Sequence, residues 1–148
     1  MQKSISERSK VILIAIIAIG SLLFMVWFIF TLLFPCTNEI KSEVESPDHQ
    51  LKAVIFSRDC GATTDVSMQV SVISKNDTLP NEAGNVFIED SGHGAARTML
   101  VSAKWTGPRE LLISHDPKAR IFKSKLQMEV PAGFSKQEKL RISYTNSE

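Results

Sequence analysis

The chain has 148 residues, and 17 Lys and Arg side chains against 16 Asp and Glu leave a formal net charge of +1. This length allows one globular domain once any membrane segment is set aside. Because the charges balance, the chain lacks the positive field that attracts a nucleic-acid backbone. We therefore expect no nucleic-acid partner.

An apolar run from Val11 to Phe34 is the first strong feature of the sequence, and its 24 residues carry no charge. As an α-helix rising 1.5 Å per residue, the run would be about 36 Å long, enough to cross a hydrocarbon core of about 30 Å. A core helix of a globular protein would need a polar face, which this run lacks. It predicts a transmembrane helix over residues 11–34, in contact with the lipid bilayer.

The charges that flank this run predict its orientation. Residues 1–10 hold three basic side chains and one acidic one, whereas residues 39–48 hold four acidic side chains and one basic one. Lys and Arg are in excess on the cytoplasmic side of membrane proteins. We expect residues 1–10 to form a cytoplasmic N-terminus and the chain from about Pro35 onward to lie outside the cytoplasm.

Two alternatives to an uncleaved anchor are open. A cleaved signal peptide has a shorter apolar region, of 7–15 residues, followed by small residues, and neither feature is present here. Cys36 directly follows the run, as in a lipoprotein, but Phe34 and Pro35 stand where lipoprotein processing needs small residues. The anchor is the preferred interpretation, and cleavage or lipidation stays open.

Cys36 and Cys60 are the two cysteines of the chain, and both lie on the predicted outer side. An even number of cysteines in an oxidising compartment indicates a disulfide. The bridge would close a loop of about 25 residues and remove unfolded-state entropy worth about 3.5 kcal/mol. Two unpaired structural cysteines are the alternative.

Alternation of apolar and polar residues dominates the rest of the chain. Residues 35–50 are mostly polar and predict a juxtamembrane connector that turns at Ser46-Pro47-Asp48. Residues 51–148 predict a β-domain, with Leu51–Ser57 apolar on both faces like a central strand. The seven predicted strands are Leu51–Ser57, Ser67–Ser74, Asn85–Asp90, Thr98–Trp105, Glu110–His115, Ala119–Val130 and Leu140–Tyr144.

No stretch after Phe34 has the apolar spacing of a three-turn helix, so the apolar face of a sheet must be covered by a second sheet, by barrel closure or by a partner. The predicted fold class is mainly β. One N-terminal transmembrane helix is followed by a small antiparallel β-sandwich or rolled sheet of about seven strands.

The segment SPDHQLKAVIFSRDCGATT (residues 46–64), with residues 69–72 and 84–88, resembles an uncharacterised bacterial family of small membrane-anchored proteins that are classed only as a domain of unknown function. Its members are similar in layout: a hydrophobic segment, a cysteine just after it, an SPDG-like turn and an R-x-C-G-A-T-T block. The resemblance covers most of residues 36–145, and His49 stands where Gly would be usual. It implies bacterial origin, an envelope location and no particular activity. Together with the predicted anchor, this gives an expected location in the bacterial inner (plasma) membrane.

The least generic stretch of the domain is the block from Arg58 to Thr64, which leaves a predicted central strand for a loop of small residues. We predict it as the candidate functional loop, with the residues Arg58, Asp59, Gly61, Thr63 and Thr64. Gly61 permits a positive φ or a close backbone approach. A catalytic alternative makes Cys60 a nucleophile and one of three histidines its base, namely His49, His93 or His115. A disulfide to Cys36 would remove the thiolate.

Other polar groups give weaker signals. No histidine spacing is typical of a metal site, so no metal, cofactor or catalytic residue is assigned. Four basic side chains cluster around one predicted strand, and they fit either an anionic partner or a solvated face. These are Lys118, Arg120, Lys123 and Lys125.

Three hypotheses of function follow from the sequence. The first is a non-catalytic, membrane-tethered envelope module whose outer domain binds a protein or cell-wall partner. The second is a thiol or hydrolytic enzyme that uses Cys60. The third is an accessory subunit of a larger membrane complex, with Gly20-Ser21 as a weak small-residue helix contact.

Overall fold

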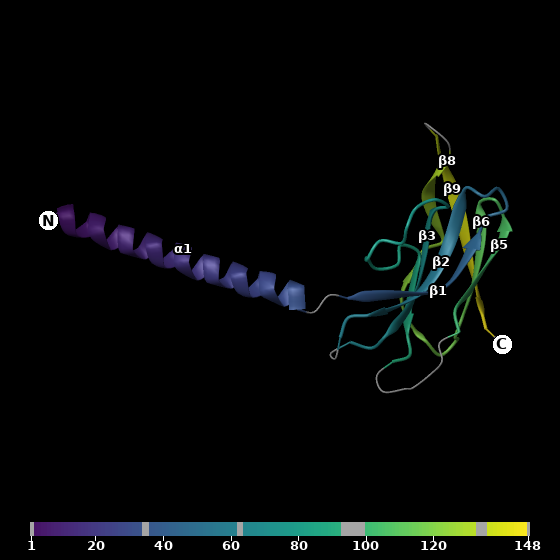
Figure 1. The fold of residues 1–148 in the computed structure, drawn as a ribbon, viewed down its shortest axis with the longest axis horizontal. Helices are drawn as coiled ribbons and strands as arrows, with labels where there is room; N and C mark the ends of the chain where they lie inside the picture. The colour runs from purple at the N-terminus through teal and green to yellow at the C-terminus, as the bar shows by residue number, and fades with distance from the viewer. Residues whose placement is uncertain (1, 34–35, 62–63, 93–99, 133–135, 148) are drawn as a thin grey trace. The chain divides into compact units, whose positions relative to one another are not determined.

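The computed structural model describes residues 2–33, 36–61, 64–92, 100–132 and 136–147 (Figure 1). By its internal contacts the chain divides into two compact units, residues 1–35 and residues 36–148. The first unit is a helix and the second is a β-domain.

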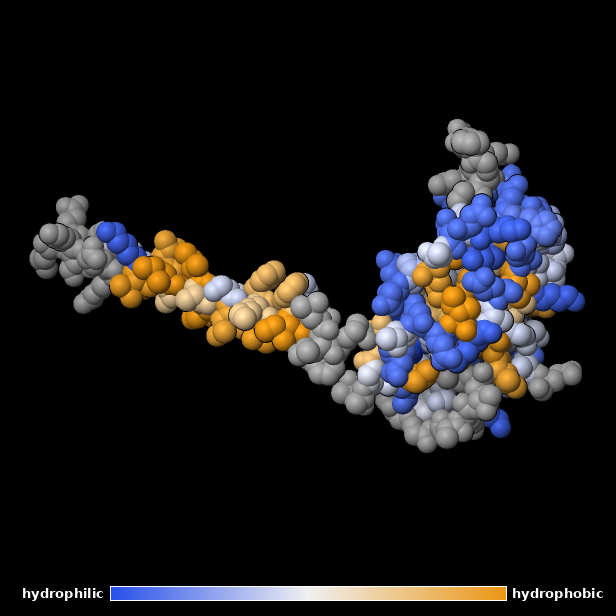
Figure 2. Space-filling view, viewed as in Figure 1, coloured by the Kyte–Doolittle hydropathy of each residue, from blue (hydrophilic) through white to orange (hydrophobic). Residues whose placement is uncertain are grey.

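Helix α1 spans Gln2–Leu33. Its stretch Ser9–Ile29 has a mean hydropathy of 2.9, and none of that stretch is buried in the described protein. Figure 2 shows hydrophobic residues along this part of the helix. The protein thus has an N-terminal helix that is long and apolar enough to cross a membrane. A signal sequence can have the same length and composition.

The described part of the β-domain contains nine strands in two sheets. The first sheet is antiparallel throughout, in the order β1 (Thr37–Glu45), β2 (Leu51–Asp59), β3 (Ser67–Ser74), β4 (Phe87–Asp90) and β7 (Arg120–Ser124). The second has the order β5 (Ser102–Gly107), β6 (Glu110–His115), β9 (Lys136–Asn146) and β8 (Gln127–Ala132). Within it β6 and β9 run parallel, and the other pairs are antiparallel.

This architecture confirms the predicted fold class, a mainly β protein with one N-terminal apolar helix, although it has more strands than expected and one parallel pair. The two sheets share a single apolar core. The first contributes Leu51, Ala53, Ile55, Met68, Val70, Val72 and Phe87, and the second Trp105, Leu111, Ile113, Val130, Leu140 and Ile142. Each fully buried large apolar side chain stabilises the fold by about 1.5–3 kcal/mol. The second sheet is therefore what covers the apolar face of the first.

Strand β2 is buried on both faces, as its sequence predicts. Ala53 and Ile55 belong to the shared core, whereas Val54 and Phe56 are also fully buried but face the other way. The segment between β3 and β4 lies against this outer face. Its Gly84 donates a backbone N–H to Gln69 Oε1 over 2.5 Å, and Gln69 is the cross-strand partner of Phe56. A Cβ at Gly84 would lie 2.8 Å from a backbone oxygen, so only glycine permits this close approach.

The predicted connector over residues 35–50 is wrong as a separate segment, because its middle part forms β1. Thr37–Glu45 pairs with β2 along its whole length, with a bulge between Ile40 and Ser42. As an edge strand, β1 is exposed on most of its surface and can therefore be polar. The expected turn follows it: Ser46 Oγ accepts the backbone N–H of Leu51 and donates to Asp48 Oδ1.

The predicted single strand Ala119–Val130 is two strands in different sheets. Lys125 still donates its backbone N–H to Val86 in the first sheet, whereas the Leu126 carbonyl accepts from Ile142 in the second. The chain crosses between the sheets at this point. Phe122 and Leu126, the apolar residues of this segment nearest the crossing, are 58% and 70% exposed. Of the predicted strand Thr98–Trp105, the structure describes residues from 100 onward, and β5 begins at Ser102.

His49 adopts a left-handed backbone conformation with a φ of 55°. This conformation costs an ordinary L-residue about 1 kcal/mol and costs glycine little. The His49 side chain contacts Glu45 at 2.8 Å on the surface. The exposed pair adds little stability, so the backbone is the larger effect at this position.

We predict that His49→Gly stabilises the domain by about 1 kcal/mol relative to His49→Ala. Both variants lose the contact with Glu45, so the difference between them isolates the backbone conformation. Urea unfolding followed by Trp105 fluorescence measures it. Equal stabilities of the two variants would show that the turn is not strained.

Glu89 of β4 is a fully buried carboxyl group within the core. Neither of its oxygens accepts a well-formed hydrogen bond from the described residues, and His115 Nδ1 lies 3.7 Å from Oε2. The His115 ring in turn packs against the rings of Phe87 and Tyr144, at 5.4 and 6.3 Å between centroids. Burial, with the negative charge of Asp116, raises the pKa of Glu89 to about 7, although the Asp116 backbone N–H acts against the shift.

This pKa predicts a loss of stability as pH rises from about 4.5 to about 7. The unfolded chain releases the Glu89 proton near 4.5, whereas the folded protein holds it until about 7. The contribution is thus fully present below 4.5, and about 3 kcal/mol is lost by pH 7. Glu89→Gln should abolish this slope when the free energy of unfolding is measured at several pH values.

Because the His115 side chain faces Glu89 at 3.7 Å, the control is His115→Asn, alone and combined with Glu89→Gln. A slope that survives Glu89→Gln but not His115→Asn would assign the pH dependence to the histidine instead.

Candidate functional site

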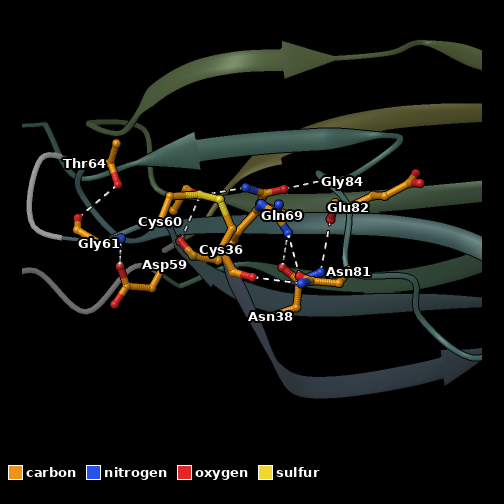
Figure 3. Close-up of a disulfide and its surroundings, with 12 residues drawn as sticks. Cys36, Asn38, Asp59, Cys60, Gly61, Thr64, Gln69, Asn81, Glu82 and Gly84 are labelled. Atoms are coloured by element: carbon orange, nitrogen blue, oxygen red, sulfur yellow. Dashed lines mark hydrogen bonds between the residues drawn. A yellow bond between two sulfur atoms is a disulfide. The ribbon is translucent and has the colours of Figure 1, made fainter. Parts of the chain in front are cut away.

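The Cys36–Cys60 disulfide marks the end of the first sheet at which the candidate site lies (Figure 3). Thr37 of β1 is the register partner of Asp59 of β2. Antiparallel pairing therefore places the residue before Thr37 opposite the residue after Asp59, with the two cysteine Cα atoms 4.0 Å apart. The pairing predicted from the cysteine count is present, and it occupies both cysteines of the chain.

The predicted loop turns directly after the disulfide. Asp59 Oδ1 accepts the Gly61 backbone N–H over 2.8 Å, and the Gly61 carbonyl accepts from both the backbone and the hydroxyl of Thr64. Gly61 has a φ of 94°, so glycine is required here, as the sequence suggested. Thr63 lies outside the described residues. Local hydrogen bonds thus hold the described residues Asp59, Gly61 and Thr64 next to the disulfide (Figure 3).

Arg58 is held by two side-chain amides. Its Nη1 donates to Asn38 Oδ1 over 2.6 Å and to Asn81 Oδ1 over 3.2 Å. Both amides are fixed in turn: Asn38 Nδ2 donates to the carbonyls of Pro80 and Glu82, and Asn81 Nδ2 donates to the Cys36 carbonyl. The network joins β1, β2 and the segment before β4 around one guanidinium.

A cavity of about 300 Å³ opens beside this network. It is lined by side chains from both ends of the predicted loop and from three neighbouring strands. The lining residues are Arg58, Cys60, Thr64, Asp65, Ser67, Gln69, Ala83, Asp90, Arg120 and Phe122. The cavity is therefore formed by residues close together in the sheet but distant in the sequence.

Arg120 and Phe122 form the wall that β7 contributes. The Arg120 guanidinium makes two hydrogen bonds to Asp90, of 3.1 and 2.6 Å, and its Cζ lies 4.8 Å from the centroid of the Phe122 ring. The hydrogen bond to Asp90 holds the pKa of Arg120 above its usual value, with a smaller contribution from the charge of Asp65. The register shift between β4 and β7 leaves Phe122 without a partner residue in β4, so its side chain turns outward.

The histidines do not assemble with Cys60 in the described residues. His49 contacts Glu45 in the turn after β1, and His115 lies against Glu89 in the core. His93 lies outside the described part of the chain. Cys60 is bonded to Cys36, so a thiolate nucleophile is not present in the oxidised protein. The described residues include no group of three or more His, Cys, Asp or Glu that could hold a metal ion.

The predicted basic cluster is divided between different roles. Arg120 lines the cavity, and Lys123 Nζ donates to the Gly84 carbonyl over 2.7 Å. Lys118 and Lys125 are exposed. The cluster is therefore not one continuous charged face.

The sequence pattern grouped Arg58, Asp59, Gly61 and Thr64 in one loop around Cys60, and in the structure these residues lie beside the disulfide. It missed the partners that the sheet brings to them, namely Asn38, Asn81, Asp90, Arg120 and Phe122. Asn38 had one available signal: once β1 is recognised as the partner of β2, the disulfide fixes the register and places Asn38 opposite Arg58.

Comparisons with protein-family models, with curated proteins and with solved structures gave no match to this chain. The structure itself therefore defines the class: a two-sheet β-domain with one disulfide, preceded by an apolar helix of membrane-spanning length.

We predict that Cys36→Ser lowers the stability of the domain by about 3.5 kcal/mol, because the unfolded chain regains the freedom of the closed loop. The free energy of unfolding in urea measures this loss. Cys60→Ser and the double variant should match it, since each removes the same bridge. Alkylation of Cys60 in the native, unreduced protein would contradict the disulfide.

Proposed function

We propose that this chain is a single-pass protein of the bacterial inner membrane whose β-domain lies outside the cytoplasm and binds a protein or cell-envelope partner. The disulfide at the start of the domain is the observation that carries the proposal. Structural disulfides persist in oxidising compartments and are rare in the cytosol. A domain that follows a membrane-length helix and holds a disulfide fits the outer side of a membrane.

The flanking charges support the same orientation, since residues 1–10 are net positive and the start of the domain is net negative. Binding, rather than catalysis, is supported by the cavity beside the disulfide. Its Arg58, Asp90 and Arg120 side chains are held by hydrogen bonds to neighbouring groups, and its single cysteine is oxidised. The resemblance to a bacterial membrane-anchored family is consistent with this location.

An accessory subunit of a larger membrane complex is the second candidate. In α1 a Cβ at Gly20 would have no neighbour within 4 Å, and the Ser21 hydroxyl is turned back to the Ala18 carbonyl. Small residues of this kind permit close helix–helix approach in a bilayer. In this case the helix itself would contact the partner.

Protease accessibility tests the topology. In intact spheroplasts, external protease should degrade the β-domain, whereas an epitope at the N-terminus should be protected until the membrane is permeabilised. Protection of the domain would overturn the proposed orientation.

Site-specific crosslinking in intact cells tests the binding role. A photoreactive residue at Thr64 or Phe122, both on the cavity, should capture a defined partner, and one at the exposed Lys139 on β9 should not. A photoreactive residue at Gly20 is the matched position for the accessory-subunit candidate. Capture from Gly20 alone would favour that candidate over a partner of the β-domain.

A further inference from the structure

Arg58 differs from the other arginines of the described β-domain in having no carboxylate partner. Arg109 contacts Asp48 and Glu138, Arg120 contacts Asp90, and Arg141 contacts Glu110. The hydrogen bonds of Arg58 go to neutral amide oxygens. Its charge is therefore oriented by the protein without being neutralised by it.

The donors that remain on Arg58 are available to a ligand. Its Nη1 is occupied by Asn38 and Asn81, whereas Nε and Nη2 have no partner among the described residues. Neither atom is among the fully buried atoms that lack a partner, so each keeps some accessible surface on this partly buried side chain. Nε and Nη2 form the side of a guanidinium that binds a carboxylate with two parallel hydrogen bonds.

The network around Arg58 fixes this fork in advance. Asn38 and Asn81 are themselves anchored by backbone carbonyls, including that of the disulfide cysteine Cys36 (Figure 3). A ligand therefore would not have to order a flexible arginine side chain, and less conformational entropy would be lost on binding.

The rest of the cavity limits the ligand. Asp90 is occupied by Arg120, and Asp65 adds a second negative charge near that pair, so a multiply charged anion is disfavoured. Phe122, 58% exposed, offers an apolar surface within the same cavity. The volume of about 300 Å³ lies at the lower end of ligand pockets and suits the end of a chain.

We propose that this cavity binds the terminal carboxylate of a peptide, with the carboxylate on Arg58 Nε and Nη2 and the adjacent apolar side chain against Phe122. This inference rests on the proposed binding function and gives its ligand class. The site would recognise a free carboxyl end, whether it belongs to a protein or to a short envelope peptide.

NMR titration of the full chain in detergent micelles tests the proposal. The probes are N-acetyl-Ala-Leu-Phe with a free carboxylate, its C-terminal amide, a version ending in D-Ala, and inorganic phosphate. The free acid should shift the backbone amide signals of Arg58, Thr64 and Ser67 at millimolar concentration. The amide should bind at least tenfold more weakly, because it lacks the charge that pairs with Arg58. Tighter binding of the version ending in D-Ala would indicate an envelope peptide, and tighter binding of the all-L peptide would indicate a protein terminus.

Variants separate the site from general effects. Arg58→Gln should reduce the affinity for the acid to that for the amide, whereas Arg141→Gln, a matched loss of an arginine outside the cavity, should not change it. Phe122→Ala removes the apolar surface without removing any hydrogen bond and should also weaken binding. If Arg58→Gln disturbs the fold, the affinity of Phe122→Ala for the free acid tests the site instead.

Equal binding of acid and amide, tighter binding of phosphate, or no shift at the cavity would overturn the proposal. If crosslinking from the cavity still captured a partner, the binding role would stand and only the ligand class would fail. If the cavity bound the carboxylate but no partner was crosslinked, the proposed ligand class would be supported and a protein partner would be contradicted.

Discussion

Strand β2 has to be covered on both faces, because apolar side chains alternate along it without leaving a polar face to water. Its inner face is covered by the second sheet, and its outer face by the segment between β3 and β4. Its two edges are filled by β1 and β3. The neighbouring strands, the close approach at Gly84 and the disulfide after Asp59 all depend on the position of this strand.

Covering the outer face with an irregular segment has a chemical consequence. Such a segment brings backbone carbonyls over a sheet, and these groups need donors. Asn38 donates to the Pro80 and Glu82 carbonyls of this segment. The segment's own Asn81 donates to the Cys36 carbonyl, and its Asn85 pairs with the backbone N–H and carbonyl of Val72 in the manner of an added strand. As a result, the Arg58 guanidinium donates its hydrogen bonds to the side-chain amides of Asn38 and Asn81 and not to carboxylates. The unneutralised guanidinium is thus a result of how the outer face is closed.

The sequence was most informative where one strand stays in one environment. Ser67–Ser74 and Glu110–His115 were predicted with their observed bounds. It was least informative where periodicity says nothing about partners. The alternation from Ala119 to Val130 continues unchanged across the passage between sheets, and β1 is an edge strand whose side chains need not be apolar. For the same reason, only part of the candidate site could be predicted. The loop residues are close together in the sequence, whereas Asp90, Arg120 and Phe122 are brought to the site by strand pairing.

The disulfide also determines how the domain would respond to mechanical force. Residue 36 is the first residue of the domain after the helical unit, and β1 begins at Thr37 as an edge strand. Without the bridge, tension on the chain at residue 36 would separate β1 from β2 one hydrogen bond at a time. With the bridge, the load passes from Cys36 through sulfur to Cys60 and enters the end of β2, which pairs on both edges. Tension applied through the helix is therefore borne by the most deeply held strand of the domain.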